Sequence, residues 1–216
     1  MANIPCAKFI SLTYGASGSK QERSINFARY LISYNPALAS KIALHITCIG
    51  KSKNDILKIV EEFYNLGIRQ FVAVRGDGEI PENGFSYASD LISGIRKKFF
   101  DIAIYAAGYP ENPHDLDFLH NKISYGVNGI ITQICFDAKI VEDFSAKLNI
   151  SVLPGVVLPD EKTLSFAQKL GIAVPDKIPD PPAFLHNQVQ SLMNYGFKHI
   201  HFYTLNNIDN LSFLLN

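Results

Sequence analysis

The feature that most constrains the fold is a strict alternation of short apolar runs with stretches of helical spacing. In 53–68, for example, Ile56, Val60 and Phe63 recur on one helical face, and Gly67 follows as a C-cap. Strands that alternate with helices predict a parallel sheet with the helices outside it. The predicted strands are 8–15, 42–50, 70–77, 101–110, 129–136, 150–159 and 199–206, and the predicted helices are 22–34, 53–68, 87–99, 115–126, 139–149, 161–171 and 183–196.

Two architectures satisfy this pattern, a doubly wound open sheet and a TIM-type (β/α)8 barrel. Nearly every predicted strand ends in polar or glycine-containing residues, and in a barrel all those ends meet at one face, where the active site lies. This favours a barrel, formed by residues 1–216 as a single domain. Only seven strands are recognisable, because the proline-rich stretch 175–184 is predicted to be a loop. The missing strand is either absent or lies upstream of Met1, so we expect an incomplete barrel.

The stretch QFVAVRGDGE (70–79) shows most clearly how an apolar strand gives way to polar residues of a possible site. An apolar strand stops in Arg75-Gly76-Asp77, where two opposite charges flank a glycine. The glycine allows a close backbone turn while the two charged side chains project to opposite sides. The alternative is an ordinary surface corner closed by a salt bridge. The same change at the ends of the other strands favours the site interpretation.

Composition excludes several classes of protein. The 216 residues are 47% hydrophobic and 19% charged, which is enough for a substantial core. Lys and Arg total 20 and balance 20 Asp and Glu, whereas a nucleic-acid binder usually has a basic excess. Three cysteines without a CxxC pair argue against a disulfide framework and against a metal site. With no apparent signal peptide and no apolar run of membrane-spanning length, a soluble cytoplasmic protein is expected.

A series of short motifs points to one family. In order along the chain they are FISLTYGASGS, HITCIG, AVRGD, YASDLI, AAGYPE, GIITQICFD, LPGVVLP and HFYTLN. Together, from Phe9 to about Asn207, they resemble methylenetetrahydrofolate reductase. The resemblance implies a (β/α)8 barrel with FAD at the carboxyl ends of the strands. It also implies reduction of 5,10-methylenetetrahydrofolate to 5-methyltetrahydrofolate, with NADH or NADPH supplying the hydride through the flavin.

The motifs carry expected roles over to individual residues. The FAD-binding residues implied by the resemblance are Thr13, His45, Arg75, Gly76, Asp77, Tyr87, Ala88, Asp90, Gly108, Tyr109 and, near the flavin's phosphates, Lys122. Gln133 would contact folate, and Phe166 would pack against the folate or nicotinamide ring. Asp77 would lie near the isoalloxazine, where its charge tunes redox chemistry, so Asp77 and Gln133 are the expected catalytic residues.

Each of these positions also has a structural interpretation. His45 could be a hydrogen-bonded residue of the core, and Thr13 could bond locally at a strand end. Gln133 could satisfy neighbouring backbone groups. Phe166 could be a core residue of an amphipathic helix, and Tyr109 could belong to an ordinary turn before proline. The family resemblance favours the functional interpretation of all five.

The sequence also departs from the family. The family's first strand contains a glutamate in a Phe-Glu-Phe-Phe-Pro-like motif, the acid that helps open the folate's five-membered ring. This chain starts beyond that motif, so we expect both strand and acid to be missing, and a general acid typically contributes about 10²- to 10⁴-fold in rate. The loop after Tyr109 is shortened, and Phe118 and Asn121 stand where polar or basic residues reach the FAD tail. Lys162 replaces a folate-binding glutamine, and Asn207 replaces an arginine.

These features lead to two expected functions. The first is a flavoprotein reductase of one-carbon and methionine metabolism that uses FAD, NAD(P)H and a folate substrate. The alternative is a weak or inactive paralogue that binds flavin or pterin. Such a paralogue could form a homo-oligomer, or pair with a partner subunit that supplies the missing strand and acid at a sheet edge.

Overall fold

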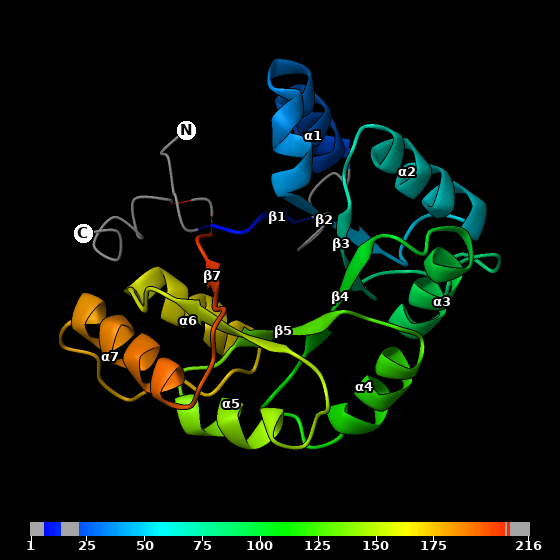
Figure 1. The fold of residues 1–216 in the computed structure, drawn as a ribbon. Helices are drawn as coiled ribbons and strands as arrows, with labels where there is room; N and C mark the ends of the chain where they lie inside the picture. Colours follow the sequence, from blue (N-terminus) through cyan, green and yellow to red (C-terminus); the bar gives the residue numbers. More distant parts are fainter. Residues whose placement is uncertain (1–6, 14–21, 206, 208–216) are drawn as a thin grey trace. The chain divides into compact units, whose positions relative to one another are not determined.

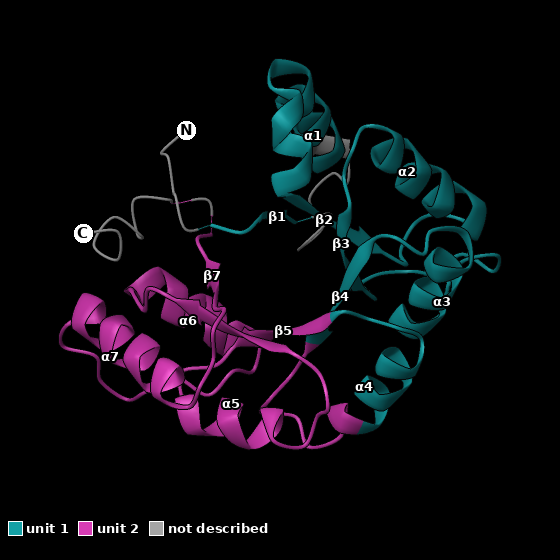
Figure 2. Ribbon diagram, viewed as in Figure 1, with its two compact units in different colours: residues 1–107, 117–128 teal, residues 108–116, 129–216 magenta. Residues whose placement is uncertain are grey.

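The computed structural model describes residues 7–13, 22–205 and 207, and these form two compact units (Figure 2). The first unit contains residues 1–107 and 117–128, and the second contains 108–116 and 129–216. Of the sequence features above, Cys6, Tyr14, Gly15 and Asn206 lie outside the described residues. The single-domain organisation therefore stays a prediction.

Unit 1 is built on four parallel strands that pair in the order of the sequence. The strands are β1 (Ile10–Leu12), β2 (Ile42–Thr47), β3 (Gln70–Val74) and β4 (Ala103–Gly108), of which Gly108 counts with unit 2. The helices are α1 (Glu22–Tyr34), the 3-10 helix η2 (Pro36–Lys41), α2 (Lys53–Asn65), α3 (Ala88–Lys98) and α4 (Asp115–Ser124), which begins in unit 2. Within unit 1 the helices lie on one side of the strands (Figure 1).

The two faces of the unit 1 sheet differ in burial. Leu44, Phe71 and Ile104 are paired level with one another and are fully buried on one face, as expected for strands covered by helices. The next level contains His45, Val72 and Tyr105 on the opposite face, where His45 and Tyr105 are only half-buried. One face of these strands is therefore core, and the other is partly open.

Unit 2 continues the same pattern with three parallel strands, again in sequence order. Its elements are β5 (Gly129–Ile134), α5 (Ala138–Ser145), β6 (Val152–Val157), α6 (Glu161–Lys169), α7 (Pro181–Asn194) and β7 (His201–Tyr203). Val156 of β6 packs with Leu185 and Leu192 of α7, and Val157 packs with Ala167 of α6. Sequential parallel order confirms the predicted class, an incomplete TIM-type (β/α)8 barrel with seven recognisable strands, because a doubly wound sheet reverses its order at a switch point.

The predicted loop 175–184 is wrong at its end. The sequence places the following helix from 183, but α7 begins at Pro181. The Asp180 carboxylate caps this helix by accepting a hydrogen bond from the Ala183 N–H at 3.0 Å. Proline fits the first turn of a helix, where its missing N–H has no intrahelical partner to lose. Within the described part of the chain, no helix combines the length and apolar character needed to cross a bilayer.

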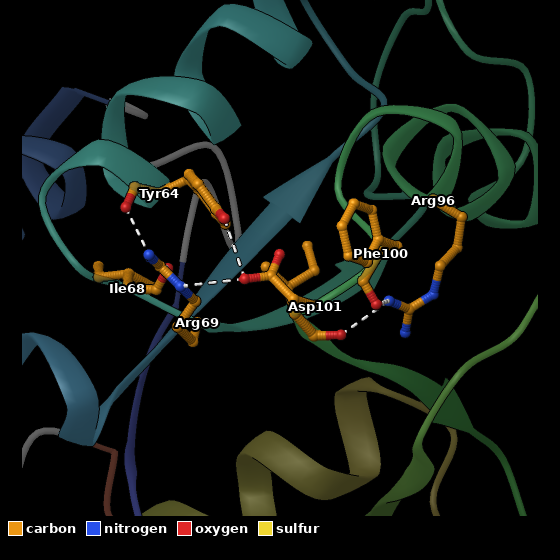
Figure 3. Close-up of polar contacts among 7 residues, drawn as sticks. Tyr64, Ile68, Arg69, Arg96, Phe100 and Asp101 are labelled. Carbon is orange, nitrogen blue, oxygen red and sulfur yellow. Dashed lines mark hydrogen bonds and ion pairs between the residues drawn. The ribbon is translucent and has the colours of Figure 1, made fainter.

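Arginine side chains lock the amino-terminal edge of unit 1 (Figure 3). Arg69 donates to the Tyr64 carbonyl at 2.6 Å, and its guanidinium lies 3.8 Å from the centre of the Tyr64 ring. The Tyr64 hydroxyl in turn donates to Asp101 at 2.9 Å. This edge, where the strands begin, is the stability face of a (β/α) fold.

Arg96 makes the densest set of these contacts. It donates to the carbonyls of Gly126, Ile102 and Phe100 at 2.8, 2.7 and 3.3 Å. It also donates to the Asn128 Oδ1 at 2.7 Å. Although Arg96 belongs to a short basic run at a helix end, it is half-buried and structural, whereas the adjacent Lys97 is exposed.

We expect Arg96→Lys to lower the free energy of unfolding by about 1–3 kcal/mol, because an ammonium cannot reproduce the planar fork of donors and would leave carbonyls unsatisfied. Urea unfolding followed by circular dichroism measures the change. Lys97→Ala is the control and should stay within about 0.5 kcal/mol of the parent. Equal midpoints for Arg96→Lys and the parent would contradict the structural role.

Candidate functional site

In unit 1, the residues expected to bind the cofactor gather at the carboxyl ends of β1, β2 and β3. Leu12 pairs with Leu44, so the following residues, Thr13 and His45, lie level on adjacent strands. Thr13 is exposed and its carbonyl accepts a hydrogen bond from the Ser24 hydroxyl. His45 is half-buried on the partly open face. Both residues could contact a ligand bound above the strand ends.

The Arg75-Gly76-Asp77 corner is held by the loop that follows β2. The Cys48 N–H donates to the Arg75 carbonyl at 3.1 Å, and the Gly50 N–H donates to the Glu79 carbonyl at 3.1 Å. These bonds continue the β2–β3 pairing beyond the ends of the strands. They fix the backbone of the corner while leaving Arg75 and Asp77 exposed. Both charged side chains therefore lie outside the core, and their projection to opposite sides stays a prediction.

Gly76 is required at this corner for two reasons. Its φ of +81° lies in the left-handed region that side chains rarely adopt. A Cβ at this position would also meet the Ile49 side chain at 3.2 Å. The corner thus stacks directly on Ile49. Gly78 lies beside the same isoleucine, but a Cβ there would have ordinary contacts of 3.5 Å or more and no unusual φ.

The YASD motif begins α3. Tyr87 is exposed and Ala88 is buried against the core. The Asp90 carboxylate accepts a hydrogen bond from the Tyr87 N–H at 3.1 Å, so it caps the amino terminus of the helix. The Asp90 side chain is therefore used in the helix cap, whereas the Tyr87 side chain is exposed to solvent.

Lys122, the residue expected near the flavin's phosphates, is buried on α4. It is 9% exposed, and its ammonium donates to the Ala107 carbonyl at the end of β4 at 2.9 Å. Burial of a charged ammonium is costly unless such bonds are made. The structure therefore shows Lys122 bound to the scaffold.

In unit 2, the end of β5 carries a β-bulge. Ile131 pairs with Leu153 and Ile134 pairs with Gly155, so Thr132 and Gln133 together face the single residue Pro154. Bulges change the direction in which a side chain leaves a strand, and they are frequent beside active sites. Gln133 is half-buried at this bulge. Among the residues that the structure describes, no hydrogen bond joins its side-chain amide to the protein.

The other expected residues of unit 2 fall into two groups. Gly108 is packed tightly, because a Cβ there would lie 2.5 Å from Ile130. Tyr109 is 40% exposed, and its N–H donates to Asp115 at 2.7 Å. Phe166 is half-buried on α6 and does not belong to the core cluster that surrounds Ala167. Gly108 thus allows close packing of the backbone, whereas the rings of Tyr109 and Phe166 remain at least partly exposed.

Comparison with known proteins decides the family. The family model for methylenetetrahydrofolate reductase matches residues 1–181. The 5,10-methylenetetrahydrofolate reductase of Pectobacterium carotovorum is 31% identical over 92% of this chain and 76% of its own length. The Escherichia coli enzyme of the same name is 30% identical with the same coverage. The chain belongs to the methylenetetrahydrofolate reductase family. Yeast methylenetetrahydrofolate reductase 2 is 29% identical, over 40% of its length.

Solved structures support the fold. A 2,3-dimethylmalate lyase superposes with a TM-score of 0.60 at 13% identity, covering 96% of this chain and 72% of that chain. A Clostridium thermocellum protein that binds two copies of 5-methyl-5,6,7,8-tetrahydrofolic acid gives 0.59 at 12% identity, covering 99% and 95%. At such identities the likeness shows the fold alone.

Family membership makes the departures meaningful. Phe118 and Asn121 are both exposed on α4, and Lys162 is exposed on α6. Asn207 is exposed, and its N–H donates to the Thr204 carbonyl at 2.8 Å. All four side chains face solvent, so burial does not account for the differences from the family that are expected at these positions.

The structure adds residues to which the sequence assigned no role. Thr47 lies on the same face as His45, and its buried hydroxyl has no hydrogen-bond partner within the described chain. Tyr105 is on that face as well, with its ring 5.3 Å from that of Phe9. In unit 2, Tyr203 donates to the Thr132 carbonyl. Only strand register could have revealed these neighbours.

Gly76→Ala should lower the free energy of unfolding by about 1–2 kcal/mol, the usual cost of a left-handed conformation in a residue with a Cβ. Thermal or urea unfolding measures the change. Gly78→Ala is the matched control, two residues away beside the same isoleucine, and should be close to neutral. The corner geometry is refuted if the two variants lose stability equally.

Proposed function

We propose that this family member is an FAD-dependent 5,10-methylenetetrahydrofolate reductase that draws its hydride from NADH or NADPH. The observation that carries the proposal is the location of the residues expected to contact the flavin ring and the folate. Thr13, Arg75, Asp77 and Tyr109 are exposed just beyond strand ends of their own units, and Tyr87 is exposed at the start of α3. His45 and Gln133 are half-buried rather than absorbed into the core. Such side chains remain available to a ligand.

The flavin ring fits these residues better than its diphosphate tail does. On the ring side, His45 and the orphaned Thr47 hydroxyl offer polar contacts on a partly open strand face. The Arg75–Asp77 corner, where glycine permits close backbone approach, would hold the ring with Thr13. On the tail side, a phosphate contact from Lys122 would require its ammonium to leave or share the Ala107 carbonyl. We therefore expect weaker FAD retention than in a member with a free cation there.

The remaining positions of the motifs complete the proposed cofactor site. Tyr87, Ala88 and Asp90 would form its wall at the start of α3, and Gly108 and Tyr109 would form it after β4. Asp90 would act through the helix cap, because its carboxylate bonds the Tyr87 N–H.

When bound, FAD would relay two electrons from the nicotinamide to the folate. The protein's part is to orient the two partners and to set the electrostatics around them. Asp77 would place a negative charge near the ring. The Gln133 amide can donate to and accept from the pterin edge, and Phe166 would stack on the folate or nicotinamide ring. The product would enter one-carbon and methionine metabolism.

A second candidate is a family member that binds flavin or folate with little turnover, alone or with a partner subunit. Asn207 supports it, since a neutral amide cannot replace the charge of the family's arginine. The scaffold role of Lys122 supports it too. The fold neighbour whose solved structure contains 5-methyltetrahydrofolate shows that related folds hold the folate. We further propose a cytoplasmic location, which accords with the free buried thiols of Cys48 and Cys135.

Reconstitution distinguishes the two candidates. The purified chain is incubated with FAD, desalted, and examined for a flavin absorption spectrum. Oxidation of NADH and of NADPH is then followed with 5,10-methylenetetrahydrofolate as acceptor. Flavin retention with folate-dependent turnover supports the reductase. Flavin or folate binding without turnover supports the second candidate, and absence of both kinds of binding rejects the proposal.

Asp77→Asn tests the proposed electrostatic role. Removing a negative charge beside the ring stabilises the reduced flavin, so the reduction potential should rise by roughly 20–40 mV, as expected for an interaction of about 1–2 kcal/mol. Spectroelectrochemistry of the reconstituted protein measures it. Asp176→Asn, at another exposed aspartate, is the control. An unchanged potential in Asp77→Asn, with stability also unchanged, would show that Asp77 does not tune the flavin.

A further inference from the structure

The bulge that carries Gln133 is held from two sides by residues without an assigned role. The Gly155 N–H donates to the Thr132 hydroxyl at 2.7 Å, a side-chain bond in place of a regular ladder bond. The Tyr203 hydroxyl donates to the Thr132 carbonyl at 2.9 Å. Thr132 is completely buried, and both of its oxygen atoms accept hydrogen bonds. The residue immediately before Gln133 is therefore fixed by its side chain and by its backbone.

The residues opposite the bulge make room for these bonds. Pro154 stands opposite Thr132 and Gln133. Gly155 follows, and a Cβ there would lie 2.3 Å from the Thr132 carbonyl and 2.7 Å from the Tyr203 ring. The missing side chain is what lets Tyr203 cross β6 and reach β5. Gly155 therefore both donates to the Thr132 side chain and leaves the route open for Tyr203.

We propose that Thr132 and Tyr203 are positioning residues that hold the bulge so that the Gln133 amide keeps one orientation toward the folate. The inference rests on the proposed function for the identity of the ligand. The orientation itself depends only on contacts within unit 2. Gln133 has no bond of its own to the protein among the described residues, so its direction is set by the backbone from which it leaves.

Three substitutions separate the two bonds from general packing. Tyr203→Phe removes only the hydroxyl. Thr132→Val keeps the shape of the side chain and removes the acceptor for Gly155, whereas Thr132→Ser keeps that acceptor. Tyr195→Phe is the matched control, because Tyr195 is an exposed tyrosine of the same unit.

The first readout needs no ligand. In ¹⁵N-labelled protein, the side-chain amide of Gln133 should show increased mobility in Tyr203→Phe and Thr132→Val, but not in Thr132→Ser or Tyr195→Phe. The Gly155 amide should exchange with solvent at least tenfold faster in Thr132→Val. Unchanged Gln133 mobility in both Tyr203→Phe and Thr132→Val would overturn the proposal, whatever the protein binds.

The second readout is the dissociation constant of 5-methyltetrahydrofolate. Tyr203→Phe alone should raise the dissociation constant about three- to tenfold. In protein that already carries Gln133→Ala, the same substitution should cause no further rise, since a positioning residue acts through the residue it positions. If the double variant instead shows the product of the two single effects, Tyr203 contacts folate directly, which overturns the positioning role. If the parent binds no folate, the proposed function fails, and the mobility measurement alone decides the inference.

Discussion

Parallel pairing of consecutive strands is the constraint on which the rest of the structure depends. It brings the carboxyl ends of neighbouring strands to one edge, so residues distant in sequence become neighbours in space. Thr13 and His45 are level because Leu12 pairs with Leu44, and His45 is level with Tyr105 through Val72. In β2 and β4 the same pairing also separates buried residues from partly open ones. Without that register, the polar strand ends would be unrelated surface residues.

Close contacts of the backbone then fix the carboxyl ends of the strands that this register brings together. In unit 1, bonds from the loop after β2 extend the ladder past Arg75, and the corner rests on Ile49 because Gly76 has no side chain. In unit 2, Gly155 serves the same purpose beneath Tyr203, and the bulge at Thr132 and Gln133 is held by side chains instead of the ladder. Both units thus use a glycine to admit a contact that fixes a functional backbone.

Several polar residues near the proposed site make hydrogen bonds that support the scaffold. The Asp90 carboxylate caps α3, and the Lys122 ammonium bonds the Ala107 carbonyl. Asp115 is buried and accepts from the Tyr109 N–H. A buried charge must be hydrogen-bonded to be tolerated, and these bonds meet that requirement for Asp115 and Lys122. A family resemblance therefore includes residues whose side chains serve the fold.

The sequence by itself determined the order of the elements, the (β/α) class and the family. Apolar periodicity, helix caps and motif order are local properties, and they survive without knowledge of contacts. Even there, the start of α7 was misjudged, because a proline that breaks a helix interior is accepted in a first turn. Only the tertiary structure decided which of these side chains are exposed, as those of Asp77 and Tyr109 are. It also decided which ones bond to the protein itself, as the Lys122 ammonium does. It alone revealed the bulge at Gln133. The reason is physical: burial, register and hydrogen-bond partners arise from segments far apart in the chain, and no single segment encodes them.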